Sequence, residues 1–293
     1  MVADTTTSTL LEEGIFLGAD GVVTTVTDTS RIVSLTGDIT EIIFELGLGD
    51  RVVAVDITTT YPPAANDLKT SGRSVGFGQA LAAESVLRYE PTLVLGDESI
   101  QPIETIEQLR NAGVPVVIFK YQNSLAGVEE KIMQVAGVLG VIEAGEELSQ
   151  RVMSEIAEAQ NRAAQASEKY RVAYLYVRGP SVLFLFGKGL PTQAMIEGAG
   201  AIDVGAALGE GAITLTPEAL IAAMPDVIVL SKSGLEGLGG VDTLLEIPGI
   251  AETPAGQNRA FLAYGEAYFI NLGPRVGMAL SEFIDDLYPD LAN

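Results

Sequence analysis

One pattern occurs twice in this chain, at positions 81–95 and 215–229. Each copy holds a Leu, a Glu three positions later, a Pro seven positions after the Glu, and then an apolar run. The pattern predicts a short amphipathic helix, ended by the proline, and then a buried β-strand. A unit that occurs twice at long range favours two similar lobes, because a solenoid needs several short tandem repeats. The alternative is chance likeness between two ordinary helix–strand units.

Composition restricts the class of protein further. The 293 residues are 47% hydrophobic and 19% charged, which is typical of a globular protein with one large domain or two smaller ones. The formal net charge of −22, from 17 basic and 39 acidic residues, argues against a nucleic-acid partner, because phosphate binding needs a surplus of cations. No apolar run is long enough for a membrane span.

The chain has no cysteine and no histidine. These absences exclude disulfides, thiolate metal sites, a catalytic triad that contains histidine, and histidine ligands for zinc or haem. They favour a binding protein over an enzyme. Residues Met1–Asp4 show no signal-peptide character, so the protein is either cytoplasmic or has had an export signal removed.

Strand and helix patterns alternate along most of the chain, which predicts α/β lobes with parallel sheets. We expect an N-terminal tether and hairpin over 1–28, a first lobe over 29–142 and a second lobe over 169–293. A long amphipathic helix over 143–168 is expected to join two Rossmann-like lobes, although an ordinary surface helix is the alternative. Segment 234–240 is expected to be a glycine-rich loop, and it lacks the dinucleotide fingerprint and a Walker lysine.

Several short segments resemble the substrate-binding proteins of bacterial ABC importers for iron complexes, haem and cobalamin. The resemblance spans about residues 29–290, is closest to the haem-binding branch, and rests on the segments Arg31–Glu41, Thr58–Pro62, Ala194–Ile196, Thr253–Gly256 and Gly273–Arg275. It implies the helical-backbone periplasmic binding protein fold, with two lobes and a ligand cleft between them.

The resemblance also implies function and partners. A protein of this family captures haem or a related tetrapyrrole or iron complex and delivers it to an ABC permease with its ATPase subunits. Such a protein is periplasmic or lies on the extracellular face of the membrane, with its signal peptide removed and a lipid anchor as an open alternative. Glu84 and Glu218, which occupy equivalent positions in the repeat, would then dock onto the permease, unless they are ordinary solvated glutamates.

The chain departs from the haem-binding branch at its expected iron ligand. Relatives commonly carry a tyrosine, and an arginine two positions later, where this chain has Phe77 and Gln79. An axial ligand for haem iron must therefore come from elsewhere, with Tyr61 and Tyr176 as the candidates. Arg178 repeats the tyrosine–x–arginine spacing after Tyr176. Packing of Tyr61 against its neighbouring proline, and a coincidental spacing at Tyr176, are the alternatives.

Haem propionates need cationic partners, and Arg73, Arg178 and Arg275 are the expected ones. The helix expected to start near Asp38, where Glu41 gives capping-box spacing, offers further backbone N–H donors. Aromatic walls would come from Phe77, Phe184 and Phe186, and weaker candidate ligands are Tyr121, Lys188 and Met195.

Three other functions stay open: binding of a ferric siderophore or corrinoid, an enzyme on a two-lobed scaffold, and a structural or adhesive module.

Overall fold

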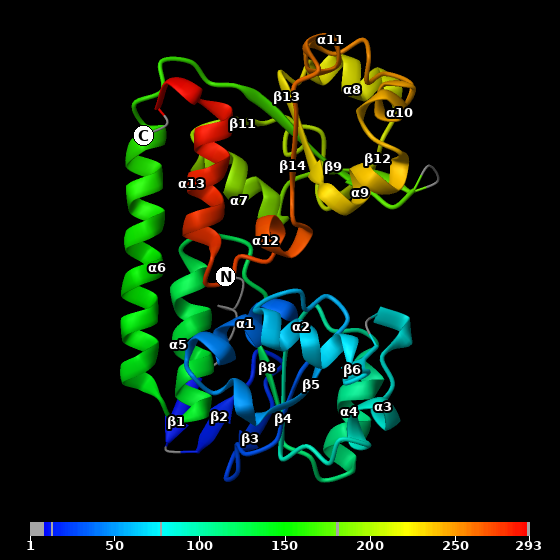
Figure 1. The fold of residues 1–293 in the computed structure, drawn as a ribbon. Helices are drawn as coiled ribbons and strands as arrows, with labels where there is room; N and C mark the ends of the chain where they lie inside the picture. Colours follow the sequence, from blue (N-terminus) through cyan, green and yellow to red (C-terminus); the bar gives the residue numbers. More distant parts are fainter. Residues whose placement is uncertain (1–8, 13, 77, 180–181, 292–293) are drawn as a thin grey trace, which may run out of the picture. The chain divides into compact units, whose positions relative to one another are not determined.

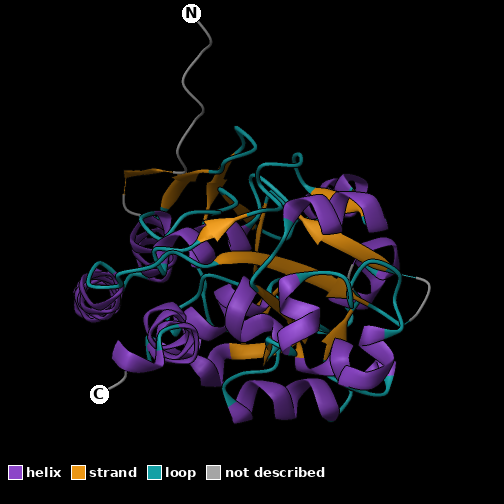
Figure 2. Cartoon of the chain, turned by 90° about the horizontal axis from the view of Figure 1, so that it is seen from above, coloured by secondary structure: helices purple, strands orange, loops and turns teal. Residues whose placement is uncertain are grey.

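The computed structural model describes residues 9–12, 14–76, 78–179 and 182–291. The chain divides into two compact units. Unit 1 comprises Met1–Gln122 and Ala126–Val152, and unit 2 comprises Asn123–Leu125 and Met153–Asn293. In each unit helices pack around the larger sheet, whereas a small N-terminal sheet lies at the edge of unit 1 (Figures 1 and 2). The fold is α/β, as the alternating pattern predicts.

The main sheet of unit 1 is parallel throughout, in the order β6-β5-β4-β7-β8. Its strands are β4 (Ile32–Ser34), β5 (Val52–Asp56), β6 (Ser74–Val75), β7 (Leu93–Asp97) and β8 (Val116–Phe119). The unit's helices are α1 (Gly37–Glu45), η1 (Gly49–Arg51), α2 (Pro63–Thr70), η2 (Gly78–Ala80), α3 (Ala83–Leu87), α4 (Ile103–Asn111) and α5 (Gly127–Leu139). The β4 and β7 side chains are all buried, which explains their continuous apolar sequences.

A small antiparallel sheet precedes this core. It consists of β1 (Thr9–Glu12), β2 (Ile15–Leu17) and β3 (Val23–Thr25) in that order. The structure thus has three strands where a two-stranded hairpin was expected. The start of the expected tether, residues 1–8, lies outside the described residues.

The sheet of unit 2 is mixed, in the order β12-β10-β9-β13-β14, with β11 paired to β9. Its strands are β9 (Arg171–Val177), β10 (Leu183–Phe186), β11 (Ile202–Asp203), β12 (Ala212–Thr214), β13 (Val227–Ser231) and β14 (Phe261–Tyr264). Strand β10 runs antiparallel to both β9 and β12. The expected parallel sheet is therefore wrong for β10 and β12, because the chain turns back directly after β9 instead of crossing over.

Helices of unit 2 follow most of these strands. They are α7 (Pro191–Gly198), α8 (Pro217–Ala223), α9 (Lys232–Leu238), α10 (Val241–Leu245), α11 (Pro254–Asn258), α12 (Glu266–Ile270), α13 (Val276–Leu287) and η3 (Pro289–Leu291). The expectation of a loop over 234–240 is wrong, because α9 covers most of that segment. A Cβ on Gly234 would lie 2.9 Å from the Val177 carbonyl oxygen, so this glycine allows the helix to approach β9 closely.

The long helix expected near 143–168 is α6 (Ile142–Ala163), which begins in unit 1 and ends in unit 2. Its apolar stripe is buried, as the spacing predicts, at Leu148, Val152, Ile156, Ala159 and Ala163. The helix ends earlier than expected, because the next backbone bonds, from Gln165 to Arg162 and from Ala166 to Ala163, span only three residues.

The repeated sequence pattern forms the same structure in both units. Helix α3, a proline and β7 make the first copy, and α8, a proline and β13 make the second. In each copy the residue before the proline has a left-handed backbone, with φ of 49° at Glu90 and 45° at Met224. Both copies are thus helix–proline–strand units, as predicted.

An arginine closes the end of each repeated helix. The Arg31 Nε donates to the Glu90 carbonyl at 2.9 Å, and the Arg171 guanidinium donates to the Ala223 carbonyl at 2.8 and 3.1 Å. Ala223 is the last residue of α8, where a carbonyl has no intrahelical partner, whereas Glu90 lies in the turn after α3. The likeness of the two copies therefore extends from the sequence to a side-chain contact.

Candidate functional site

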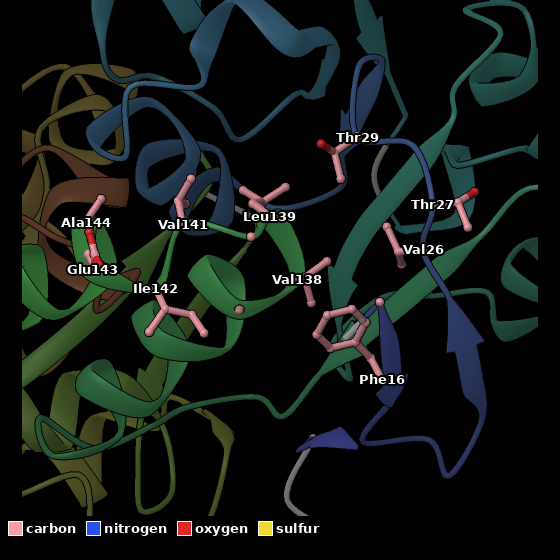
Figure 3. A pocket seen from close by; sticks show the side chains of 13 residues that line it. Phe16, Val26, Thr27, Thr29, Val138, Leu139, Val141, Ile142, Glu143 and Ala144 are labelled. Carbon is pink, nitrogen blue, oxygen red and sulfur yellow. The ribbon is translucent and has the colours of Figure 1, made fainter. Parts of the chain in front are cut away.

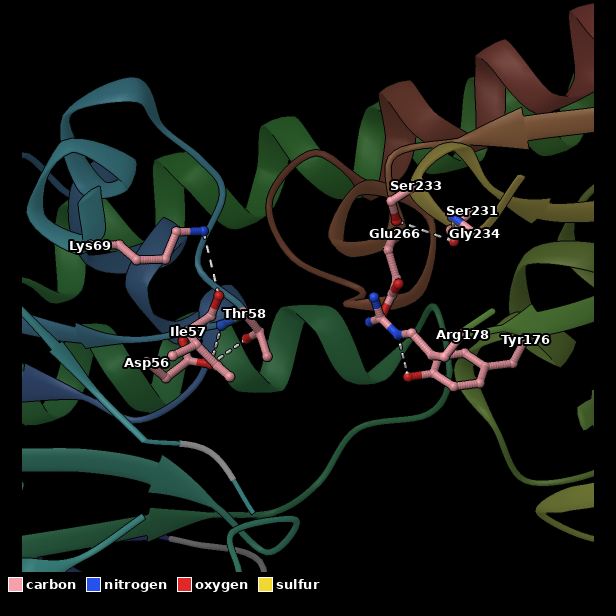
Figure 4. Close-up of polar contacts among 10 residues, drawn as sticks. All are labelled: Asp56, Ile57, Thr58, Lys69, Tyr176, Arg178, Ser231, Ser233, Gly234 and Glu266. Carbon is pink, nitrogen blue, oxygen red and sulfur yellow. Dashed lines mark hydrogen bonds and ion pairs between the residues drawn. The ribbon is translucent and has the colours of Figure 1, made fainter. Parts of the chain in front are cut away.

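Tyr176 and Arg178 are brought into contact at the end of β9 (Figure 4). Arg178 Nε donates a hydrogen bond of 2.8 Å to the Tyr176 hydroxyl oxygen, and the guanidinium carbon lies 5.3 Å from the Tyr176 ring centroid. Arg178 follows the last residue of β9, two positions after Tyr176, so both residues lie at this end of the strand. The phenol oxygen is thus held by a cationic donor in a half-buried position.

An aromatic cluster supports this pair. The rings of Tyr176 and Phe186 are stacked with centroids 5.2 Å apart, and Phe186 also packs on Tyr174. Tyr174 is buried and stacks on Phe269 of α12 at 5.8 Å. Burial, followed by nearby charges of which Glu266 is the largest, raises the pKa of Tyr174, which disfavours its phenolate. Tyr176 is therefore held by packing as well as by hydrogen bonding.

Glu266 was not singled out from the sequence, although it completes the group. Its Oε1 accepts a hydrogen bond of 2.6 Å from an Arg178 terminal nitrogen. Strands β9 and β14 both run parallel to β13, so the residues that follow them lie at the same edge of the sheet. A search for polar residues directly after the predicted strand near 259–263 would have found Glu266.

Unit 1 holds Tyr61 and Arg73, which the sequence also predicts as ligand residues. Tyr61 is half-buried and lies in the loop between β5 and α2, whereas Arg73 is exposed directly before β6. The start of the Tyr61 loop is tied by Asp56, whose Oδ2 accepts the Thr58 N–H at 2.8 Å (Figure 4). Phe77 lies outside the described residues, as does the side chain of Gln79.

Two buried carboxyl groups end the strands on either side of β4 in unit 1. Asp56 ends β5 and Asp97 ends β7, and both side chains accept hydrogen bonds from the loop residues that follow them. Burial raises the pKa of Asp56. Burial, and after it the charge of Asp38, raises the pKa of Asp97 to about 6. Sequence reasoning missed both residues, although a carboxylate directly after an apolar strand is a recognisable signal.

Asp38 forms a buried ion pair with Lys131 of α5. The predicted capping box at the start of α1 is wrong, because Thr36 is the N-cap and makes no side-chain cap hydrogen bond. The Asp38 carboxylate binds the Lys131 ammonium instead. The lysine residue is only 2% exposed. This end of α1 carries its own buried anion, so it is a poor place for a ligand carboxylate.

The remaining candidates have varied surroundings. Arg275 lies with its guanidinium carbon 5.1 Å from the Tyr268 ring centroid. Burial, and after it the charges of Asp97 and Asp38, raises the pKa of Tyr121 to about 12, which opposes its use as a phenolate ligand. Lys188 is exposed beside Glu210, and Met195 is fully buried. Phe184 is half-buried on β10 opposite Tyr176.

Glu84 and Glu218 are both exposed, in the first turns of α3 and α8. Equivalent exposure in the two units is what a docking role requires.

A separate pocket lies in unit 1, away from these residues (Figure 3). It measures about 890 Å³ and lies between the N-terminal strands and the turn that joins α5 to α6. Phe16, Val26 and Val138 line it, together with the exposed Ile142. None of the predicted ligand residues contributes to its wall.

Within the described ranges, no cluster of three or more acidic side chains has the geometry of a metal site. None of the helices described combines the length and the apolar character that crossing a bilayer requires.

Comparison with known proteins extends these observations. The model of the periplasmic binding protein family matches residues 32–268. The periplasmic haem-binding protein RhuT of Roseiflexus sp. RS-1 is 43% identical, with a TM-score of 0.83 over 91% of this chain and 100% of that chain. The haem-binding protein HmuT is 35% identical, with a TM-score of 0.87 over 98% of this chain and 93% of that chain.

Structures of HmuT are also known in which a tyrosine, an arginine two positions after it, or a histidine is replaced by alanine. Among curated proteins, the ABC transporter substrate-binding lipoprotein YvrC of Bacillus subtilis is 26% identical over 89% of this chain and 80% of its own length. A vitamin B12-binding protein of Vibrio parahaemolyticus is 24% identical over 71% of this chain and 73% of its own length. These relatives are binding proteins, none of them named as an enzyme.

Proposed function

Because this chain belongs to the periplasmic binding protein family, we propose that it is the substrate-binding protein of an ABC importer and that its cargo is haem. The family places such a protein outside the cytoplasmic membrane, and the likeness to a lipoprotein is consistent with a lipid anchor. Likeness to two haem-binding proteins over nearly the whole chain supports haem as the cargo.

The contact between Tyr176 and Arg178 carries this proposal. A tyrosine phenolate is an established axial ligand of ferric haem, and a guanidinium beside it stabilises the phenolate charge. HmuT contains a tyrosine and an arginine at the same spacing. Its replaced histidine precedes that tyrosine by the same number of positions by which Phe77 precedes Tyr176. We therefore assign the axial role to Tyr176, with Phe77 at a position without ligating ability.

Further residues are candidates for contacts with haem. Phe184 and Phe186 lie beside Tyr176 and offer apolar surface to a flat ring. Arg73 and Arg275 are the proposed partners of the propionates, together with Arg178 when it is not engaged by Tyr176. Tyr61 is the alternative axial donor. Glu84 and Glu218 are the proposed contacts to the permease, which the importer's ATPase subunits drive.

The test is a titration of the purified protein with ferric haem. We expect a saturable Soret band and a charge-transfer band of tyrosinate-ligated iron. Tyr176→Phe should abolish the charge-transfer band and weaken binding at least tenfold, about 1.4 kcal/mol, because the iron loses its ligand. Tyr61→Phe and Tyr121→Phe are the matched controls and should behave like the wild type. Loss of the band in Tyr61→Phe alone would move the axial role to Tyr61.

A corrinoid is the second candidate, because a vitamin B12-binding protein is among the similar proteins. The same titration with cyanocobalamin separates the two ligands. Saturable binding of cobalamin, with none of haem, would overturn the haem proposal and leave the importer function in place.

A further inference from the structure

We propose that Glu266 is a positioning residue, which holds the Arg178 guanidinium against the Tyr176 hydroxyl. The inference rests on the proposed haem function and adds to it a residue that does not touch the iron. It starts from one arrangement, in which a single guanidinium joins a phenol on one side to a carboxylate on the other (Figure 4).

The Arg178 side chain is half exposed, so a second contact besides Tyr176 restrains its conformation. Arg178 follows the last residue of β9, precedes Gly179 with its φ of 70°, and is 49% exposed. A long, flexible side chain at such a place samples many rotamers. Glu266 is only 23% exposed and accepts from a terminal nitrogen, which leaves Nε free to donate to Tyr176. The planar guanidinium is thus fixed at two points.

Glu266 is itself held by the core of unit 2. It is the first residue of α12, and Phe269 lies one turn later on the same helix. Phe269 is buried and stacks on Tyr174, two residues before Tyr176 on the same face of β9. The stacking of Phe269 on Tyr174 therefore fixes the distance between α12 and the end of β9. This distance allows the Glu266 carboxylate to contact Arg178.

This arrangement differs from an ordinary surface ion pair. The pair of Lys188 and Glu210 in the same unit has an N–O distance of 3.7 Å, with side chains 63% and 82% exposed. Among the described residues, no hydrogen bond or ion pair joins either partner to Tyr176, Arg178 or Glu266. The pair therefore provides a matched control, in which one carboxylate of unit 2 is removed without an effect on Tyr176.

The first experiment compares Glu266→Ala, Glu266→Gln and Glu210→Ala by titration with ferric haem. We expect Glu266→Ala to weaken binding about tenfold and to reduce the tyrosinate charge-transfer band, as loss of a supporting partner does at other metal-binding sites. Glu266→Gln keeps an oxygen acceptor and should restore most of both signals. Glu210→Ala should match the wild type. Wild-type affinity and band in Glu266→Ala would overturn the inference, as would a Glu266→Gln protein no better than Glu266→Ala.

The second experiment needs no haem. The Nε–Hε signal of Arg178, assigned by its loss in Arg178→Lys, is followed by ¹⁵N NMR in the ligand-free protein. We expect a resolved signal, with slow exchange of the Hε proton with solvent, in the wild type and in Glu210→Ala. In Glu266→Ala we expect this exchange to be fast. The same exchange rate in all three would overturn the positioning role. Failure of the wild type to bind haem, with this NMR difference intact, would instead overturn the proposed function alone.

Discussion

Lys131 places a buried ammonium group among the carboxyl groups of unit 1. It pairs with Asp38, and its charge also acts on Asp97. Removal of one partner of a buried ion pair leaves the other without compensation, which costs more than the pair itself contributes. We expect Lys131→Met to lower the free energy of unfolding by about 3–5 kcal/mol, measured by urea denaturation at pH 7.

The control is the double variant Lys131→Met with Asp38→Asn. It removes both charges of the pair and should recover a large part of the lost stability, because no unpaired charge remains at that position. If the double variant lost as much free energy of unfolding as the two single variants together, the two charges would not be coupled.

Asp203 gives a second residue-level prediction. Its Oδ1 accepts the N–H of Gly205 at 2.8 Å and of Ala206 at 3.2 Å, and burial raises the pKa of Asp203 from 3.8 to about 6. The folded protein therefore holds this proton more tightly than the unfolded chain, so its contribution to stability falls as the pH rises from about 4 to about 6. An asparagine keeps the Oδ1 acceptor but does not titrate, so the stability of Asp203→Asn should lack this decrease with pH.

As the pH rises from 4 to 8, we expect the free energy of unfolding of Asp203→Asn to increase by about 2 kcal/mol relative to that of the wild type. The measurement is urea denaturation of both proteins across this range, in which the other acidic groups cancel. A difference that does not depend on pH would contradict the role assigned to burial.

At the scale of elements, the repeated helix–proline–strand unit presents one exposed glutamate in each half of the chain. The arginine contacts at Glu90 and Ala223 close the two helices in a similar way. A short helix has few internal hydrogen bonds, so such closure helps to hold the glutamate in place. Two equivalent anionic side chains suit a permease with two basic contact points, since charge complementarity sets the orientation of docking.

We expect Glu84→Ala and Glu218→Ala each to reduce transport in vesicles with the reconstituted permease at least tenfold, while ligand affinity is unchanged. The matched controls are Glu104→Ala on α4 and Glu236→Ala on α9, which remove exposed helical glutamates elsewhere in the same two units. Weaker ligand binding in Glu84→Ala or Glu218→Ala would place that glutamate at the ligand site. Equal losses of transport in the controls would indicate a general charge effect.

The whole molecule carries a net charge of −22, because its 39 acidic residues outnumber its 17 basic residues. Mutual repulsion among surface carboxylates destabilises the compact state, and dissolved salt screens it. We expect the Tm to rise by about 2–6 °C between 0.01 and 0.5 M sodium chloride, measured by circular dichroism at pH 7.5. A Tm that falls with salt would show that attractive ion pairs outweigh the repulsion.

Sequence reasoning succeeded for features that depend on neighbouring residues. The apolar runs at β4, β7 and β13, the stripe on α6 and the proline after each repeated helix follow from periodicity and backbone geometry within a few residues. The resemblance to the family, which the family match confirms, rests on similar short segments. Tyr176 and Arg178 could be proposed because they lie two positions apart at the end of one predicted strand, and their role as ligand residues stays a prediction.

Only the tertiary structure brought together residues that lie far apart in the chain. Glu266 reaches Arg178 because β9 and β14 end at the same edge of one sheet, and Lys131 reaches Asp38 because α5 packs against α1. The sequence also failed to predict that β10 runs antiparallel beside β9 and that α9 is a helix and not a loop. These features depend on strand order and on the closeness of packing, whose free energy is shared among distant residues and leaves no local pattern to read.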